Sequence, residues 1–239
     1  MTAILKRELR ALLHTFRGWG FLALLFLGAG LGTYLNIVRT GSAFFTAALP
    51  FASYAMAPGA ILLSCTAFTA ETSHGTERVL FALPVSSLSV LLGKLLARVL
   101  WVLVGCALVC VYPVVLCFVG ENVSFAENLL PVVTLAAMGL MFVSISLACS
   151  ACSANTGTAL AMSVVLALAV FFVPNLLAAK NIPLGGLAAM FPNNAYTLAL
   201  SGIFDARPAI GYLVVSLAMD VIAFMGVLGR RHGSRRIKK

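Results

Sequence analysis

The sequence predicts an all-α integral membrane protein with six transmembrane helices, and three observations lead to that prediction. Of the 239 residues, 62% are hydrophobic and only 10% are charged, so the chain has too little polar surface to cover a water-soluble globule. The apolar residues gather in six runs, each near the ~20 residues that a helix needs to cross the hydrocarbon core of a bilayer. The basic residues, finally, are distributed unevenly between the two sides that these runs define.

The six predicted spans belong to a single domain, residues 1–239. They cover residues 19–38, 44–69, 94–118, 129–150, 157–178 and 209–229. The first run is longer than the core of a signal peptide and has no small-x-small cleavage site, so we expect it to be an uncleaved span. Six crossings place both termini on the same side of the membrane.

The basic residues predict that this side is the cytoplasm. With the N-terminus inside, the inner segments hold 13 Lys and Arg residues, while the outer segments hold only Arg39, Lys180 and Arg207. The positive-inside rule requires an asymmetry in this direction. The net charge of +9 is therefore explained by membrane orientation, and since no basic patch is interleaved with aromatic residues, we expect no nucleic-acid partner.

Residues 2–17 predict an amphipathic helix that lies flat in the cytoplasmic interface of the bilayer. Its apolar stripe consists of Leu5, Leu9, Leu12 and Phe16. Its polar side is basic, which suits anionic headgroups, and carries Lys6, Arg10, His14 and Arg17.

The segment 71–94, "ETSHGTERVLFALPVSSLSVLLGK", is a long amphiphilic stretch between two apolar runs. Thr76 can cap a short helix whose apolar positions are Val79, Leu80 and Leu83, and Pro84 ends that helix. Ser86 or Ser87 can then cap a second helix that continues through Gly93-Lys94 into the next span. The pattern predicts a bent segment at a membrane face, although any polytopic protein needs a loop here.

The residues of this segment resemble the cytoplasmic loop of type-2 ABC transporter permeases, most closely the gliding-motility-like branch with its "E…GT.E.LL..P.S…..GK" pattern. The resemblance implies a coupling helix that docks on a cytoplasmic ATPase. The positions that match, and that it implies as coupling residues, are Glu71, Gly75, Thr76, Glu77, Val79, Leu80, Leu83 and Pro84. Ser73-His74 depart from the family pattern, which often has Lys or Arg here.

The same resemblance extends to the plan of the chain. It implies that residues 2–17 are an amphipathic elbow helix and that re-entrant helices precede span 6. The residues agree, because positions 179–208 are too apolar for a soluble loop and are broken by Pro183, Gly185-Gly186 and Pro192. A family member would be a permease subunit in the cell inner (cytoplasmic) membrane, paired with an ATP-binding subunit and a second permease subunit. The family exports drugs, lipids, polysaccharide or peptides.

The sequence offers no catalytic constellation, so we expect no enzymatic activity in this chain and no cofactor or metal. The pair Gly93-Lys94 lacks the remaining residues of the phosphate-binding G-x-x-x-x-G-K-[ST] motif, and ATP hydrolysis is therefore expected in a partner. The histidines are scattered over separate segments without neighbouring ligands. Cys149-x-x-Cys152 has redox or metal spacing, but the run of small residues around it favours close helix packing.

Asp220 is the single acidic residue inside a predicted span, and two interpretations of it stay open. A protonated side chain bonded to a neighbouring helix is one; a substrate or gating function is the other. The small-residue series Gly28-x-Gly30-x-Gly32 likewise suits either dimerisation or internal packing. Two alternatives to transport also stay open: a membrane scaffold or assembly factor, and a membrane-embedded enzyme that uses Asp220 or the Cys149/Cys152 pair.

Overall fold

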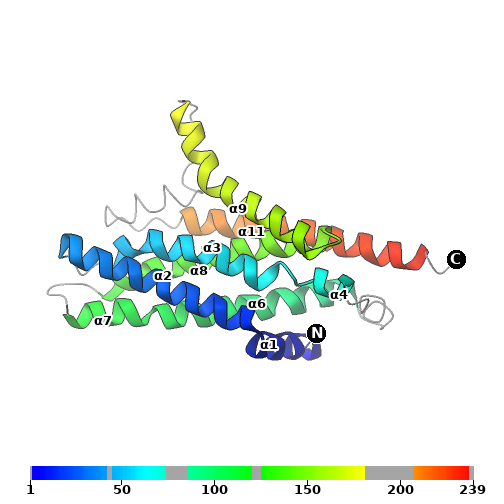
Figure 1. The fold of residues 1–239 in the computed structure, drawn as a ribbon, viewed down its shortest axis with the longest axis horizontal. Helices are drawn as coiled ribbons and strands as arrows, with labels where there is room; N and C mark the ends of the chain where they lie inside the picture. Colours follow the sequence, from blue (N-terminus) through cyan, green and yellow to red (C-terminus); the bar gives the residue numbers. More distant parts are fainter. Residues whose placement is uncertain (1, 42–44, 74–85, 120–124, 181–206, 237–239) are drawn as a thin grey trace.

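A computed structural model describes residues 2–41, 45–73, 86–119, 125–180 and 207–236, and over these ranges the chain is helical. In chain order the elements are α1 (Thr2–His14), α2 (Phe16–Thr40), η1 (Phe45–Ala48), α3 (Leu49–Ser64), α4 (Thr69–Ser73), α6 (Ser87–Val109), α7 (Val111–Val119), α8 (Phe125–Cys152), α9 (Thr156–Ala179) and α11 (Arg207–Arg236). Most of them run side by side along the long axis of the molecule (Figure 1).

Six helical segments are long and apolar enough to cross a membrane, which confirms the predicted fold class. They are Phe16–Arg39, Leu49–Ser73, Ser87–Phe118, Leu129–Cys152, Thr156–Val173 and Arg207–Arg231. The third begins seven residues before the predicted boundary, because Ser86 caps α6 and accepts a hydrogen bond from the N–H of Ser89. Pro113 explains the break between α6 and α7, since it has no N–H to donate to the carbonyl four residues before it.

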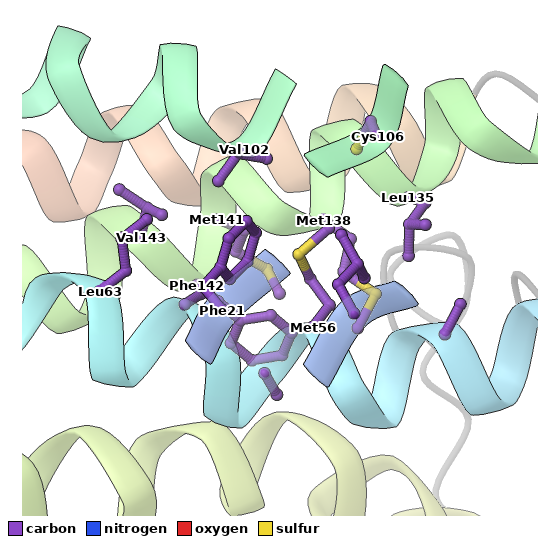
Figure 2. Packing of buried hydrophobic residues seen from close by; sticks show 14 of the residues in the cluster. Phe21, Met56, Leu63, Val102, Cys106, Leu135, Met138, Met141, Phe142 and Val143 are labelled. Carbon is purple, nitrogen blue, oxygen red and sulfur yellow. The ribbon is translucent and has the colours of Figure 1, made fainter. Parts of the chain in front are cut away.

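Helix α8 is the centre of the bundle and contacts α3, α6, α7, α9 and α11. Every residue from Met141 to Ser150 on it is buried. Around Phe21, Met56 and Phe142, apolar side chains from α2, α3, α6 and α8 meet in one cluster (Figure 2). Lipid chains are as apolar as these side chains, so dense packing and not exclusion of water holds such helices together.

Glycines allow α2 to lie close to η1, α3 and α7. A methyl group added at Gly28 would lie 2.4 Å from Cβ of Ala55, and one at Gly32 would lie 2.9 Å from the carbonyl oxygen of Ala48. One at Gly30 would lie 2.5 Å from the hydroxyl of Tyr112 on α7. The glycine series of span 1 therefore serves packing within the chain.

Helix α9 is the least embedded span. Only 17% of its apolar window is buried, against 83% for α8, and its C-terminal part diverges from the other spans in Figure 1. Aromatic contacts still connect it to the bundle, since the ring of Phe171 lies 5.3 Å from that of Tyr54 and 5.6 Å from that of Phe142.

Helix α1 is the amphipathic helix predicted at the N-terminus, and most of its apolar stripe packs against protein. Leu12 is buried, and Leu5 and Leu9 pack against the protein core, where α1 lies along α6. Phe16, the fourth residue of the predicted stripe, begins α2 and is 87% exposed. The apolar stripe is therefore covered by protein. Helical periodicity shows that a helix has an apolar side, but it does not show whether protein or lipid covers that side.

Candidate functional site

The predicted coupling segment, residues 71–94, begins and ends in described helices. Glu71 lies on α4, while Gly93 and Lys94 lie in the second turn of α6. The other predicted coupling residues fall outside the described residues: Gly75, Thr76, Glu77, Val79, Leu80, Leu83 and Pro84. The re-entrant helices expected before the last span also lie outside the described residues. The site is therefore built from the helices that flank the segment.

An ion pair joins the two ends of the coupling segment. Nζ of Lys94 lies 2.8 Å from Oε1 of Glu71. It also lies 3.1 Å from Oε1 of Glu8 on α1 and donates to the carbonyl of Ala67 at 2.7 Å. The three ammonium hydrogens thus have three acceptors, as they must in a side chain that is only 2% exposed.

Two arginines complete this ion-pair cluster, which we define as Arg7, Glu8, Glu71, Lys94 and Arg98. Arg98, one turn after Lys94, lies 3.3 Å from Oε2 of Glu8 and is 4% exposed. Arg7 approaches Glu71 from the more exposed side, at 2.8 Å. The cluster connects α1, α4 and α6 across separations of up to 90 residues in sequence.

Glu8 is ionised at neutral pH. Burial by itself raises the pKa of its carboxyl group, but the charges of Lys94 and Arg98 and the hydrogen bonds from Lys94 and Arg7 outweigh that effect. Together they lower the pKa to about 2. Glu8 lies on the side of α1 that faces α6, and no local pattern in the sequence distinguishes it.

Gly93 allows α1 to lie close to α6 at the ion-pair cluster. A methyl group added at this position would lie 2.9 Å from Cγ2 of Ile4. The Gly93-Lys94 pair therefore has two structural functions within this chain, because the glycine gives α1 room and the lysine binds Glu8 of the same helix.

Arg230, near the end of α11, binds the C-terminal end of α8. Its Nε donates to the carbonyl of Ala151 at 2.7 Å and its Nη2 to that of Ser150 at 2.9 Å. A guanidinium here satisfies carbonyls that the helix end leaves unpaired, and its charge complements the helix dipole. A further hydrogen bond runs from Arg230 to the hydroxyl of Thr72 on α4.

The turn between α3 and α4 is held from the side of α8 and α9. The hydroxyl of buried Ser150 accepts a hydrogen bond from the N–H of Phe68 at 3.0 Å. The hydroxyl of Thr156, at the start of α9, donates to that of Thr69 at 3.1 Å. The short helix that carries Glu71 is thereby fixed by five other helices: α1, α6, α8, α9 and α11.

Asp220 lies on the side of α11 that contacts α8. Its side chain is half-buried, and its hydrogen-bonding neighbour is Ser144 of α8. The Oδ1 atom is buried without a hydrogen-bond partner in the described part of the chain. This arrangement suits a neutral carboxyl group between two helices, which was one of the two interpretations of the sequence.

Cys149 and Cys152, the pair with redox or metal spacing, lie at the C-terminal end of α8. All six cysteines are free thiols, and Cys149 is buried whereas Cys152 is exposed. Within the described ranges, no group of three or more His, Cys, Asp or Glu side chains could hold a metal ion. Small side chains around the pair instead admit α11, since a methyl group at Gly226 would lie 3.1 Å from Sγ of Cys152.

An apolar groove of about 530 Å³ lies between α3 and α9. Its lining includes Tyr54, Ile61 and Leu62 from α3 and Leu168, Phe171 and Phe172 from α9. Both helices are candidate membrane spans, so the groove lies at membrane depth. Its volume falls within the ~300–1,000 Å³ range of small-molecule sites.

The sequence contains a signal for the functional importance of Lys94 and Arg98. Both stand four residues apart on one helix that continues as an apolar span, and a cation in that position needs a partner. Few acids are available, because the whole chain contains only seven.

These features define a polytopic helical membrane protein with an apolar groove at membrane depth. At one end of its bundle it has a polar layer, which consists of the ion-pair cluster together with Arg230 and its hydrogen-bond partner Thr72. Residues 35–228 match the family model described as ABC-2 family transporter protein. The match covers most of the chain, and the protein belongs to this family. No curated protein matches the chain.

Members of this family are membrane components of ABC transporters, which confirms the predicted type-2 permease class. The match does not confirm the gliding-motility-like branch within the family.

Proposed function

We propose that this protein is the permease subunit of an ATP-driven exporter in the cytoplasmic membrane, and that a separate ATPase subunit acts on its coupling segment. The observation that carries the proposal is the ion-pair cluster, which fixes both ends of segment 71–94 to the membrane bundle of an ABC-2 family protein. Such a connection transmits a displacement of the segment to α1 and α6 instead of letting it move alone.

The arrangement of the helix ends supports the same proposal. Helices α1 and α4, and the C-terminal end of α11, lie at one end of the bundle (Figure 1). The hydrogen bond from Arg230 to Thr72 connects the last two directly, and Arg231 donates to Ser87 at the start of α6 at 3.1 Å. We assign this end to the cytoplasm, in agreement with the distribution of basic residues.

Within the coupling segment, we propose two kinds of function. Val79, Leu80 and Leu83 form the apolar face that enters a groove on the ATPase, with Glu77 beside it and Gly75, Thr76 and Pro84 shaping the turn. Glu71 has a positioning function: Lys94 and Arg7 bind its carboxylate and so hold the start of the segment against the bundle.

A second permease subunit, either another copy of this chain or a relative, completes the pathway in this proposal. Helix α9 leaves most of its apolar surface outside the bundle, and an apolar groove lies between it and α3. An apolar groove at membrane depth suits the hydrophobic part of a substrate.

The test is copurification of the permease with its ATPase, together with ATP-dependent transport. Leu80→Ala removes an apolar contact and Glu77→Arg reverses a charge, and either change should release the ATPase or uncouple hydrolysis from transport. Truncating one buried anchor at such a contact costs about 2 kcal/mol or more, equivalent to roughly 30-fold in affinity.

Glu127→Arg is the matched control for charge reversal, because residue 127 precedes span 4 at the opposite membrane face in the predicted topology. It should leave both copurification and transport unchanged. Wild-type copurification and coupling in both segment variants would show that the segment does not dock on the ATPase.

A further inference from the structure

We propose that the outer face of α1 binds the headgroup of an anionic phospholipid from the adjacent leaflet. This face contains a groove of about 640 Å³, lined by Lys6, Arg7, Arg10, Ala11, His14 and Thr15. Its ionisable side chains are all basic types. A lipid phosphate is the anion that a membrane surface supplies to such a groove.

The other face of α1 is already covered by protein. Leu12 is buried, Leu5 and Leu9 pack against the core, and Ile4 contacts Gly93 of α6. The helix therefore cannot turn its apolar stripe to the bilayer as an isolated interfacial helix does. Its contact with the membrane has to come from the basic face and from residues at its C-terminal end.

Two cations of the basic face, Lys6 and Arg10, keep their charge available to an anion. The nearby carboxylates of Glu8 and Glu71 bind Lys94, and from this face they bind Arg7. Of the ion pairs within the described ranges, none includes Lys6 or Arg10. Both side chains are exposed, so an anion can reach them without displacing an internal partner.

The neighbouring aromatic residues place the groove at headgroup level. Phe16 is 87% exposed and Trp19 is 57% exposed at the start of α2, which is the first membrane span. Exposed Trp at the end of a span marks the membrane–water interface. Nε1 of Trp19 donates to the carbonyl of Leu13 at 2.7 Å, so the end of α1 and this interface are joined directly.

Trp19 also provides the measurement. The full-length protein is reconstituted into phosphatidylcholine vesicles that contain a minority of lipid with brominated chains, either phosphatidylglycerol or phosphatidylcholine. Bromine quenches the exposed Trp19, whereas the chain's other tryptophan, Trp101, is only 6% exposed. Brominated phosphatidylglycerol should quench at a lower mole fraction than brominated phosphatidylcholine, and sodium chloride should reduce that preference.

Lys6→Gln with Arg10→Gln should abolish the preference, because each charge at a membrane surface contributes about fivefold and the pair on the order of 25-fold. Lys6→Arg with Arg10→Lys keeps both charges and should retain it. Arg39→Gln, which removes an exposed charge at the other end of α2, should also leave it unchanged. The melting temperature of each variant shows whether it folds. If a double variant does not fold, the two single variants are measured in its place.

Equal quenching by the two brominated lipids in the wild-type protein would overturn the proposal. So would a preference that survives in the Lys6→Gln/Arg10→Gln variant. If that variant keeps its lipid preference but releases the ATPase, the basic face belongs to an acidic protein surface. The measurement needs no ATPase, so its failure leaves the proposed transport function standing.

Discussion

Glu8 lies between Lys94 and Arg98 and forms an ion pair with each of them. Both cations are almost fully buried, and neither would be tolerated there without a counter-charge. The carboxylate in turn depends on them, since their charges lower its pKa to about 2 against the opposing effect of burial. This mutual dependence makes the stability of the protein sensitive to acid.

We predict that the protein loses stability between about pH 4.5, the ordinary pKa of Glu8, and about pH 2, its pKa in the folded state. The pKa is lowered on folding, so the stabilisation is complete above this window and disappears as the pH falls through it. The amount at neutral pH is about 3 kcal/mol. Thermal unfolding of the detergent-solubilised protein as a function of pH measures it.

Glu8→Gln separates this effect from the titration of other acids. At neutral pH the variant should lose about 3–5 kcal/mol, because two buried cations lose a counter-charge. The variant should also lack the loss of stability at low pH that protonation of Glu8 causes in the wild type. Arg10→Gln on the exposed side of the same helix is the control, with an expected change within about 0.5 kcal/mol. Identical acid profiles for Glu8→Gln and the wild type would exclude Glu8 as the titrating group.

Asp220 offers a prediction of the opposite kind, because its environment at membrane depth favours an uncharged group. Asp220→Asn keeps the shape and the hydrogen bond toward Ser144, so the protein should still reach the membrane and melt near the wild-type temperature. Asp220→Lys should impair insertion or packing, since a charge at the centre of a span costs on the order of 3 kcal/mol. Membrane abundance and melting temperature are the measurements.

Transport by the Asp220→Asn variant distinguishes packing from function. A variant that still assembles with the ATPase and hydrolyses ATP, but transports nothing, would assign Asp220 to the pathway instead of to the α8–α11 contact.

The contact between α2 and α3 depends on the absence of side chains at particular glycines. We predict that Gly28→Ala destabilises the protein by about 1–3 kcal/mol, because the added methyl group would lie 2.4 Å from Cβ of Ala55 and the helices must separate. Gly20→Ala on the same helix is the matched control. Its methyl group would lie 3.7 Å from the ring of Phe16, so it should be neutral or slightly stabilising through helix propensity.

Thermal unfolding of the two variants measures the difference. If Gly28→Ala is as stable as Gly20→Ala and instead changes only the oligomeric state, the glycine series is a surface for association between chains.

The individual helices could be predicted from sequence because each follows from a local pattern. Apolar runs of about the length of a bilayer crossing give the six spans, and a serine cap places the start of α6 at Ser87. The ion-pair cluster could not be predicted in this way, since Glu8 and Lys94 are 86 residues apart. Helical periodicity identified the apolar stripe of α1 but not its partner, because α6 and lipid are both apolar.

The arrangement of the whole bundle decides which side a partner can reach. Glu71, Lys94 and Arg230 all belong to the polar layer at the end where α1 begins. Residues Arg39 and Lys180, two of the three basic residues of the predicted outer segments, lie at the opposite ends of their spans. If the polar layer is cytoplasmic, every element of the proposed coupling faces the compartment that contains ATP.

We therefore predict that the polar layer faces the cytoplasm, which single cysteines in a variant without the six native cysteines can test. Thr2→Cys and Ser73→Cys should react with a membrane-impermeant maleimide only after permeabilisation, whereas Arg39→Cys and Lys180→Cys should react in intact cells. All four positions are exposed in the structure, so a missing reaction reports on the membrane and not on burial. The reverse pattern would place the coupling segment outside the cell, where no cytoplasmic ATPase could bind it, and the proposed function would then fail as a whole.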